Sequence, residues 1–246
     1  MEDKATEAKS VWHTEKQTTL YLEGVRGAIP GAEIQLTVLR KIVEMWRPHP
    51  AEILDLGCGD GILGRLILDI APEAHATFVD FSQPMLQALA AKLTNISRAT
   101  IIKADFSTPA WLETLGNHAP FDVVVSGFSI HHQPDERKLE LYAEVYQLLA
   151  KGGVFLNLEH VASLTPAGKA LFDDMFIDNL LKLHRATDPA KTREEVATAF
   201  YSRPDKQENI LAPVEAQTEW LRRLGFSDVD CYFKIFELAL FGGRKP

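Results

Sequence analysis

The stretch that decides the fold is Ile53-Leu54-Asp55-Leu56-Gly57-Cys58-Gly59-Asp60-Gly61. An apolar run reaches an acidic residue, and three glycines follow on alternate positions. This pattern predicts a short buried strand, a tight turn and then a helix over Ile62–Ile70. Glycine suits the turn because it adopts backbone angles that a Cβ forbids and lets a ligand lie on the main chain. The free N–H groups that open the helix favour a carboxylate or phosphate, so we expect a nucleotide-like ligand.

The same stretch fits two ligand classes. Gly59-Asp60-Gly61-Ile62-Leu63-Gly64 satisfies the dinucleotide pattern G-x-G-x-x-G as a string. However, the negative charges of Asp55 and Asp60 would repel a pyrophosphate, whereas they are compatible with the zwitterionic amino-acid tail of a ligand. The order acid-x-Gly-x-Gly-x-Gly resembles motif I of the class I S-adenosylmethionine-dependent methyltransferases, and this resemblance implies a Rossmann-like fold, S-adenosylmethionine as cofactor and methyl transfer. An NAD-binding protein with the same fold remains an alternative.

Composition sets the outer bounds. The 246 residues are 46% hydrophobic and 24% charged, which is typical of a globular chain long enough for one large domain. A net charge of −8 gives no support to a nucleic-acid partner. The two cysteines, Cys58 and Cys231, are too few for a disulfide framework or a metal site, and no apolar run is long enough to span a bilayer. We therefore expect a cytoplasmic protein that acts on a small molecule.

Strands and helices alternate over residues 51–158, which predicts an α/β, doubly wound, mostly parallel sheet with helices on both faces. The predicted strands are 52–56, 76–80, 100–103, 121–126 and 154–159, followed by a tight antiparallel pair at 229–235 and 236–242. The predicted helices are 34–46, 62–70, 84–93, 135–150, one opened by Pro166, 192–200 and 214–224. We expect a single domain with its core at 51–159 and 214–246 and a helical lid at 1–50. The helical insertion at 160–213 either caps the pocket or pairs two subunits in a homodimer.

Acidic residues also close the next two strands. Asp80 lies 80 − 61 = 19 residues beyond Gly61, where a carboxylate can accept both hydroxyls of a ribose. Asp105 follows the third strand, and the resemblance implies that it accepts a hydrogen bond from the adenine amino group. Alternatively, Asp80 and Asp105 are simply turn residues or helix caps. The predicted cofactor-binding residues are Asp55, Gly57, Gly59, Gly61, Asp80, Phe81, Met85, Asp105, Phe106 and Ser126.

The fourth strand ends before His131 and His132, the only adjacent imidazole pair in the chain. Either can take a proton near neutral pH, and either can simply cap the turn. The resemblance places this segment beside the methyl acceptor. The predicted catalytic residues are His131, His132 and Glu159, and the predicted substrate-binding residues are Tyr21, Arg26, His160, Tyr201 and Arg203. No metal is predicted, because the histidine pair has no further ligands at a recognisable spacing.

The layout from Ile29-Pro30-Gly31 through Asn209 to Gly243-Arg244-Lys245 also resembles the carboxy-S-adenosylmethionine synthases, which modify the cofactor itself. Such an enzyme needs a cation near the methyl group to hold a carboxylate, for which Arg26, Arg185 and Arg203 are candidates. The glycine loop and the histidine pair keep the ordinary methyltransferase form. The sequence therefore favours methyl transfer to an O, N or C nucleophile of a small molecule.

Overall fold

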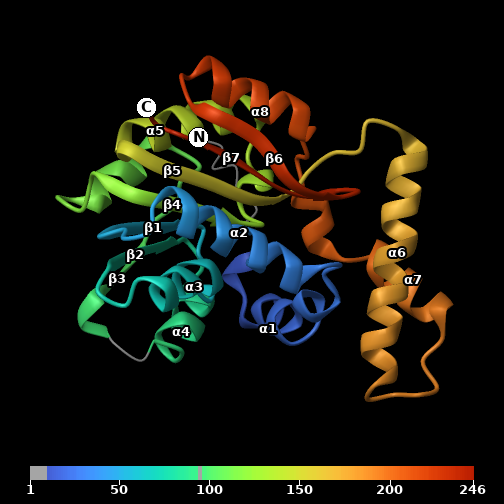
Figure 1. Ribbon diagram of the computed structural model, residues 1–246. Helices are drawn as coiled ribbons and strands as arrows, with labels where there is room; N and C mark the ends of the chain where they lie inside the picture. Colours follow the sequence, from blue (N-terminus) through green and yellow to red (C-terminus); the bar gives the residue numbers. More distant parts are fainter. Residues whose placement is uncertain (1–9, 94–95) are drawn as a thin grey trace, which may run out of the picture.

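A seven-stranded sheet in the order β3-β2-β1-β4-β5-β7-β6 forms the centre of the computed structural model, which describes residues 10–93 and 96–246 (Figure 1). The first five strands run parallel, and β7 runs antiparallel to both β5 and β6. The predicted sheet and its antiparallel C-terminal pair are confirmed. The strands are β1 Glu52–Leu56, β2 His75–Asp80, β3 Ala99–Lys103, β4 Phe121–Gly127, β5 Leu149–His160, β6 Ser227–Ile235 and β7 Leu238–Arg244.

Helices cover both faces of the sheet because alternate strand residues point to opposite sides. In β1, Ile53 packs toward α2 (Ala32–Trp46), α3 (Ile62–Ile70) and α4 (Gln83–Ala90). Leu54 and Leu56 pack toward α5 (Asp135–Leu148) and α8 (Val214–Arg223). Residues 53–56 of the strand are buried between the two layers, which explains why its apolar residues do not alternate with exposed polar ones.

The boundary between α5 and β5 differs from the prediction. The predicted helix end at residue 150 is wrong, because α5 stops at Leu148 and Leu149 already pairs with Phe121 of β4. The register then passes from Leu149 opposite Phe121 to Val154 opposite Val123, so residues 150–153 bulge from the ladder. Similarly, β7 begins at Leu238 and not at 236, since Phe236 has a φ of 49° and lies in the turn.

The insertion forms a separate helical pair. Helix α6 (Pro166–Arg185) packs on α7 (Arg193–Tyr201), and together they stand at one end of the sheet beside the N-terminal segment (Figure 1). Their shared core is aromatic, with Phe172, Phe176 and Phe200 in contact. A short helical turn, η6 (Pro204–Glu208), leads back to the core.

The N-terminal segment lies across the carboxyl ends of the strands. It consists of η1 (Val11–His13), α1 (Glu15–Glu23) and η2 (Val25–Ala28) before α2. The first nine residues of the predicted lid lie outside the described residues. Among the residues that the structure describes, no helix is both long and apolar enough to cross a membrane.

Candidate functional site

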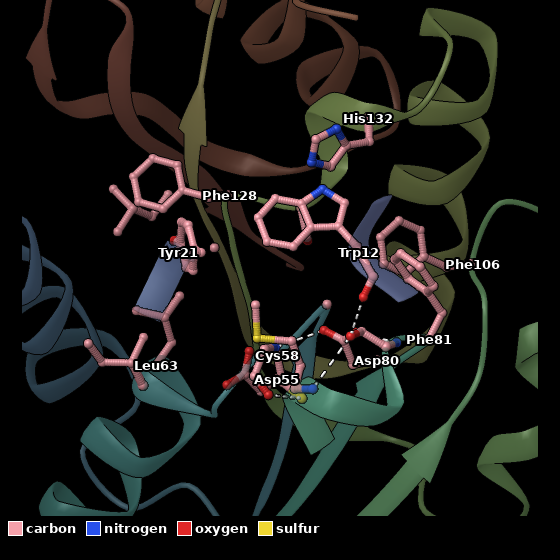
Figure 2. Close-up of a pocket in the computed structure, with 18 of the residues that line it drawn as sticks. Trp12, Tyr21, Asp55, Cys58, Leu63, Asp80, Phe81, Phe106, Phe128 and His132 are labelled. Carbon is pink, nitrogen blue, oxygen red and sulfur yellow. Dashed lines mark hydrogen bonds between the residues drawn. The ribbon is translucent and has the colours of Figure 1, made fainter. Parts of the chain in front are cut away.

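A cavity of about 980 Å³ opens where the parallel strands end (Figure 2). Its floor is the glycine loop after β1, its sides are the loops after β2, β3 and β4, and its roof is the N-terminal segment. Asp55, Gly57, Gly59, Asp80, Phe81, Met85, Asp105, Phe106, Tyr21, Arg26 and His132 all line it. Residues that the sequence placed in one site thus come together from four strand ends and the N-terminal segment.

The glycine loop has two distinct kinds of glycine. Gly59 has a φ of 54°, and a Cβ added there would find only the Met85 sulfur, 3.8 Å away, so this position faces the cavity. Gly61 has a φ of 76°, and a Cβ there would lie 2.4 Å from a methyl group of Leu89. Glycine at position 61 is therefore required for packing. The sequence prediction placed Gly61 in the cofactor site, but in the structure it does not line the cavity.

Asp80 is held by the backbone on both carboxylate oxygens. Its Oδ2 accepts from the N–H of Gly59 at 2.8 Å, and its Oδ1 accepts from the N–H of Ser82 at 2.8 Å. Burial raises the pKa of Asp80, and these backbone hydrogen bonds oppose the rise. Each oxygen keeps a further lone pair for a ligand hydroxyl, since a carboxylate offers about four acceptor positions.

Asp55 provides an acceptor without a partner. Its Oδ2 accepts from the N–H of Gly64 at 2.8 Å, whereas its buried Oδ1 has no hydrogen-bond partner among the described residues. Burial raises the pKa of Asp55 to about 8, although the hydrogen bond from Gly64 opposes the rise. A buried orphan acceptor is costly, so its place on the cavity wall suits the cationic group of a ligand.

Asp60 does not line the cavity, contrary to the expectation from its place in the loop. It is buried, and its Oδ2 pairs with Arg26 Nη1 at 2.6 Å and Lys92 Nζ at 2.5 Å. Burial alone would raise its pKa, but these two cations hold the pKa below its ordinary value. Asp60 therefore ties the N-terminal segment to the glycine loop and neutralises Arg26.

The N-terminal segment is bonded to both sides of the cavity. The Ser82 hydroxyl donates to the Trp12 carbonyl at 2.7 Å on one side. On the other, the Ser10 hydroxyl and the Val11 N–H donate to the Glu208 carboxylate at 2.7 and 2.9 Å. Figure 2 shows the indole of Trp12 lying across the cavity below His132, and its ring centroid is 6.0 Å from that of His132.

Of the adjacent histidine pair, His132 is the one that faces the cavity. Its Nδ1 lies 3.2 Å from the carbonyl oxygen of Glu208. A carbonyl can only accept, so Nδ1 carries the proton and Nε2 keeps its lone pair. Burial lowers the pKa of His132 to about 4, and the neighbouring His131 contributes in the same direction. The ring is therefore neutral at pH 7 and able to accept a proton.

His131 and Glu159 lie behind this ring and away from the main cavity. His131 Nδ1 is 2.5 Å from Glu159 Oε1, and the rings of His131 and His132 are 4.0 Å apart between centroids. Glu159 also accepts the backbone N–H groups of His131 at 3.1 Å and His160 at 2.8 Å. Burial raises the pKa of Glu159 to about 7 and lowers that of His131 well below its ordinary value. The pair supports His132 and does not itself reach the main cavity.

Three other predicted residues lie elsewhere than expected. Ser126 does not reach the cavity, because its buried hydroxyl donates to the Leu56 carbonyl at 2.7 Å. Tyr201 is the last residue of α7, is 60% exposed and lines neither cavity, so its expected place in a polar loop is wrong. Arg185 is exposed and donates to the Lys191 carbonyl.

His160 and Arg203 line a second cavity of about 240 Å³ under the insertion. Trp12, Phe128 and Glu208 line the main cavity, and the sequence prediction did not include them among the site residues. In the described ranges 10–93 and 96–246, no group of three or more His, Cys, Asp or Glu side chains is arranged to hold a metal ion.

Comparisons with known proteins agree with this fold. Residues 53–153 match the family described as a methyltransferase domain. A demethylmenaquinone methyltransferase of Leptospira interrogans is 29% identical over 122 residues; the match covers 50% of this chain and 47%, about half, of that relative. A carboxy-S-adenosyl-L-methionine synthase of Campylobacter lari is 24% identical over 228 residues, covering 90% of this chain and 88% of the relative. The structure of human N-acetylserotonin methyltransferase in complex with S-adenosylmethionine shares the fold, with a TM-score of 0.59 and 15% identity over 96% of this chain and 57% of that one.

Proposed function

Residues 53–153 of this chain form a class I S-adenosylmethionine-dependent methyltransferase domain, and on that premise we propose that the protein methylates an O, N or C nucleophile of a small-molecule acceptor. S-adenosylmethionine supplies a methyl group already activated on a positively charged sulfur. The chain then has to hold the acceptor atom in line behind the methyl group and, where needed, remove its proton. The single observation that carries the proposal is the unpartnered Asp55 Oδ1 on the wall of the cavity.

The cavity residues fit this cofactor. In our proposal Asp80 accepts the ribose hydroxyls, and Asp55 accepts the ammonium of the methionine tail beside Gly59. Asp105 and Phe106 contact the adenine, with the apolar wall completed by Phe81 and Met85. At about 980 Å³ the cavity is at the upper end of the range for ligand sites, which leaves room for an acceptor beside the cofactor.

We assign the proton-accepting role to His132. Its Nε2 lone pair and its place on the cavity wall support this role, and the lowered pKa keeps the ring neutral at pH 7. His131 and Glu159 act as positioning residues, because neither lines the main cavity: His131 packs on His132, and Glu159 bonds to His131. The neighbouring Tyr21 and Arg26 line the acceptor side of the same cavity.

The domain division follows the same contacts. We propose that residues 1–50 cover the cavity, that 51–159 and 214–246 form the core, and that 160–213 cap the acceptor side. The hydrogen bonds from Ser10 and Val11 to Glu208 support the cover, since they join the first segment to the insertion over the cavity. The homodimer and the cytoplasmic location stay predictions.

A carboxy-S-adenosylmethionine synthase-like activity is the second candidate, because the similarity to such a synthase extends over 90% of the chain. The cations that it needs are already engaged, however. Arg26 is paired with Asp60, and Arg203 donates to Asp205. A carboxylate on the cofactor would therefore have to displace an existing ion pair, which favours methyl transfer.

The deciding experiment incubates the purified protein with S-adenosylmethionine and a panel of hydroxyl, amine and activated-carbon acceptors, and weighs the nucleoside product. We expect S-adenosylhomocysteine, formed only when an acceptor is present. A heavier, carboxylated nucleoside formed with carboxylate donors would instead identify the second candidate. Calorimetry with S-adenosylhomocysteine and with NAD tests the dinucleotide alternative, and NAD binding without thioether binding would overturn the proposal.

A further inference from the structure

The second cavity continues the main one toward the insertion. Trp12, Phe128 and His132 belong to the walls of both, so the proposed proton acceptor lies at their junction. At about 240 Å³ the second cavity, here called the side chamber, is smaller than the range for a complete drug-sized ligand. It suits one part of a molecule whose other part lies in the main cavity.

The side chamber combines aromatic walls with balanced charge. Phe172 and Phe176 of α6 and Phe200 of α7 line it, with neighbouring ring centroids 5.6 and 5.5 Å apart. Three basic and three acidic side chains also line it: Lys169, Arg203, Lys206, Asp173, Asp205 and Glu237. Because the formal charges cancel, the chamber as a whole favours neither an anion nor a cation.

In the side chamber, one carboxylate oxygen of Asp173 lacks a hydrogen bond. Asp173 Oδ2 accepts from Lys169 Nζ at 2.7 Å, but Asp173 Oδ1 is buried and without a hydrogen-bond partner among the described residues. Lys206 Nζ forms an ion pair with this oxygen at 3.8 Å, a distance that is too long for a hydrogen bond. Lys206 Nζ lies 3.3 Å from the ring centroid of Phe200 and, within the described part of the chain, donates no side-chain hydrogen bond. An acceptor and a donor thus line one chamber, and among the described residues neither atom makes a hydrogen bond.

The chemistry of the missing partner follows from this pair. A group bound there must donate to Asp173 Oδ1 and accept from Lys206 Nζ. A hydroxyl does both through one oxygen atom, whereas a carboxylate would face Asp173 and an ammonium would face Lys206. The three phenylalanine rings favour a planar apolar body beside that group.

We propose that the side chamber binds the non-reacting end of the methyl acceptor, and that this end is an aromatic ring bearing an un-ionised hydroxyl. The inference rests on the proposed function for the other end of the acceptor, which lies beside His132. It makes Asp173 and Lys206 specificity residues and gives the insertion a role in choosing the acceptor.

The test uses three probes of similar size: 4-bromophenol, 4-bromobenzoate and 4-bromobenzylamine. Crystals of the full chain with S-adenosylhomocysteine are soaked with each at about pH 7, where a phenol stays un-ionised, and anomalous scattering locates the bromine. We expect the phenol in the side chamber, and calorimetry in solution should show that it binds at least ten times more tightly than the other two.

Lys206→Met keeps the stem over Phe200 but removes the donor, and Asp173→Asn removes the charge. Each should weaken phenol binding about tenfold or more without changing S-adenosylhomocysteine affinity, which also reports correct folding. Asp174→Asn is the matched control, because the adjacent carboxylate points outward to Arg193. Bromine found only in the main cavity, equal affinity for the three probes, or an unchanged affinity in Lys206→Met would overturn the inference. Failure of S-adenosylhomocysteine to bind, with the phenol still in the chamber, would instead count against the proposed function alone.

Discussion

Replacing Asp80 by alanine tests the proposed cofactor site at its most constrained side chain. In the proposal its carboxylate accepts two ribose hydroxyls, and the loss of one such charge-assisted hydrogen bond, the least we expect, corresponds to about 1.5–3 kcal/mol. The dissociation constant for S-adenosylhomocysteine should therefore rise roughly 10- to 150-fold. Part of any loss can come from the protein itself, because Asp80 also accepts the N–H groups of Gly59 and Ser82 at 2.8 Å.

A second ligand separates the two contributions. Calorimetry compares S-adenosylhomocysteine with its 2′,3′-dideoxy analogue, in the wild type and in Asp80→Ala. The wild type should prefer the complete ribose by about 1.5–3 kcal/mol, and the variant should bind both ligands equally. Asp69→Ala, an exposed acid of α3, should leave both affinities unchanged. If Asp80→Ala still distinguishes the two ligands, the ribose hydroxyls are bound elsewhere and our assignment of the second strand is refuted.

Three further predictions follow from the same cavity. His132→Gln should lower methyl-transfer turnover about 100-fold or more, because proton removal is lost. Its S-adenosylhomocysteine affinity should stay near the wild-type value, and His118→Gln is the control. Full activity in His132→Gln would contradict the proton-accepting role. The pKa of Asp55 is about 8 in the free protein and should fall beside a cationic ligand, so at pH 7 binding releases a proton and affinity rises with pH up to about 8. Calorimetry in buffers of different ionisation enthalpy measures that proton, and uptake instead of release would exclude the contact. Gly59→Ala should leave a folded protein that binds the nucleoside poorly. Gly61→Ala should lower the melting temperature more, because its Cβ would lie 2.4 Å from a methyl group of Leu89. Equal melting temperatures of the two variants would contradict the distinct roles of the two glycines.

The sequence was most informative where local pattern and tertiary environment agree. Helix α3 has the predicted bounds, Ile62–Ile70, because an αL glycine begins it and its apolar face packs on the sheet. The bounds of β5 were not predictable in the same way. Leu149 to Lys151 continue a helical pattern in sequence, but pairing of Leu149 with β4 places them in the strand.

The same contrast holds for the site. Asp55 and Asp80 were predicted because each acid directly ends a strand, and the carboxyl ends of parallel strands meet at one edge. Glu208 could not be found in this way, because it contacts Ser10, 198 residues away, through a crossing of two segments that no local pattern encodes. Tyr201 was misplaced because α7 continues one residue further than predicted and turns the ring outward.

Glu208 holds two parts of the protein at once: its carboxylate binds Ser10 and Val11, and its carbonyl faces Nδ1 of His132. We expect nucleoside exchange to break the hydrogen bonds of Ser10 and Val11 to Glu208, because these bonds hold the N-terminal segment over the cavity. We therefore expect the His132 ring to be oriented for proton transfer only while the N-terminal segment covers the cavity. Product release should then be the slow step of the catalytic cycle. A turnover number that falls as solvent viscosity increases would be the kinetic signature of that timing.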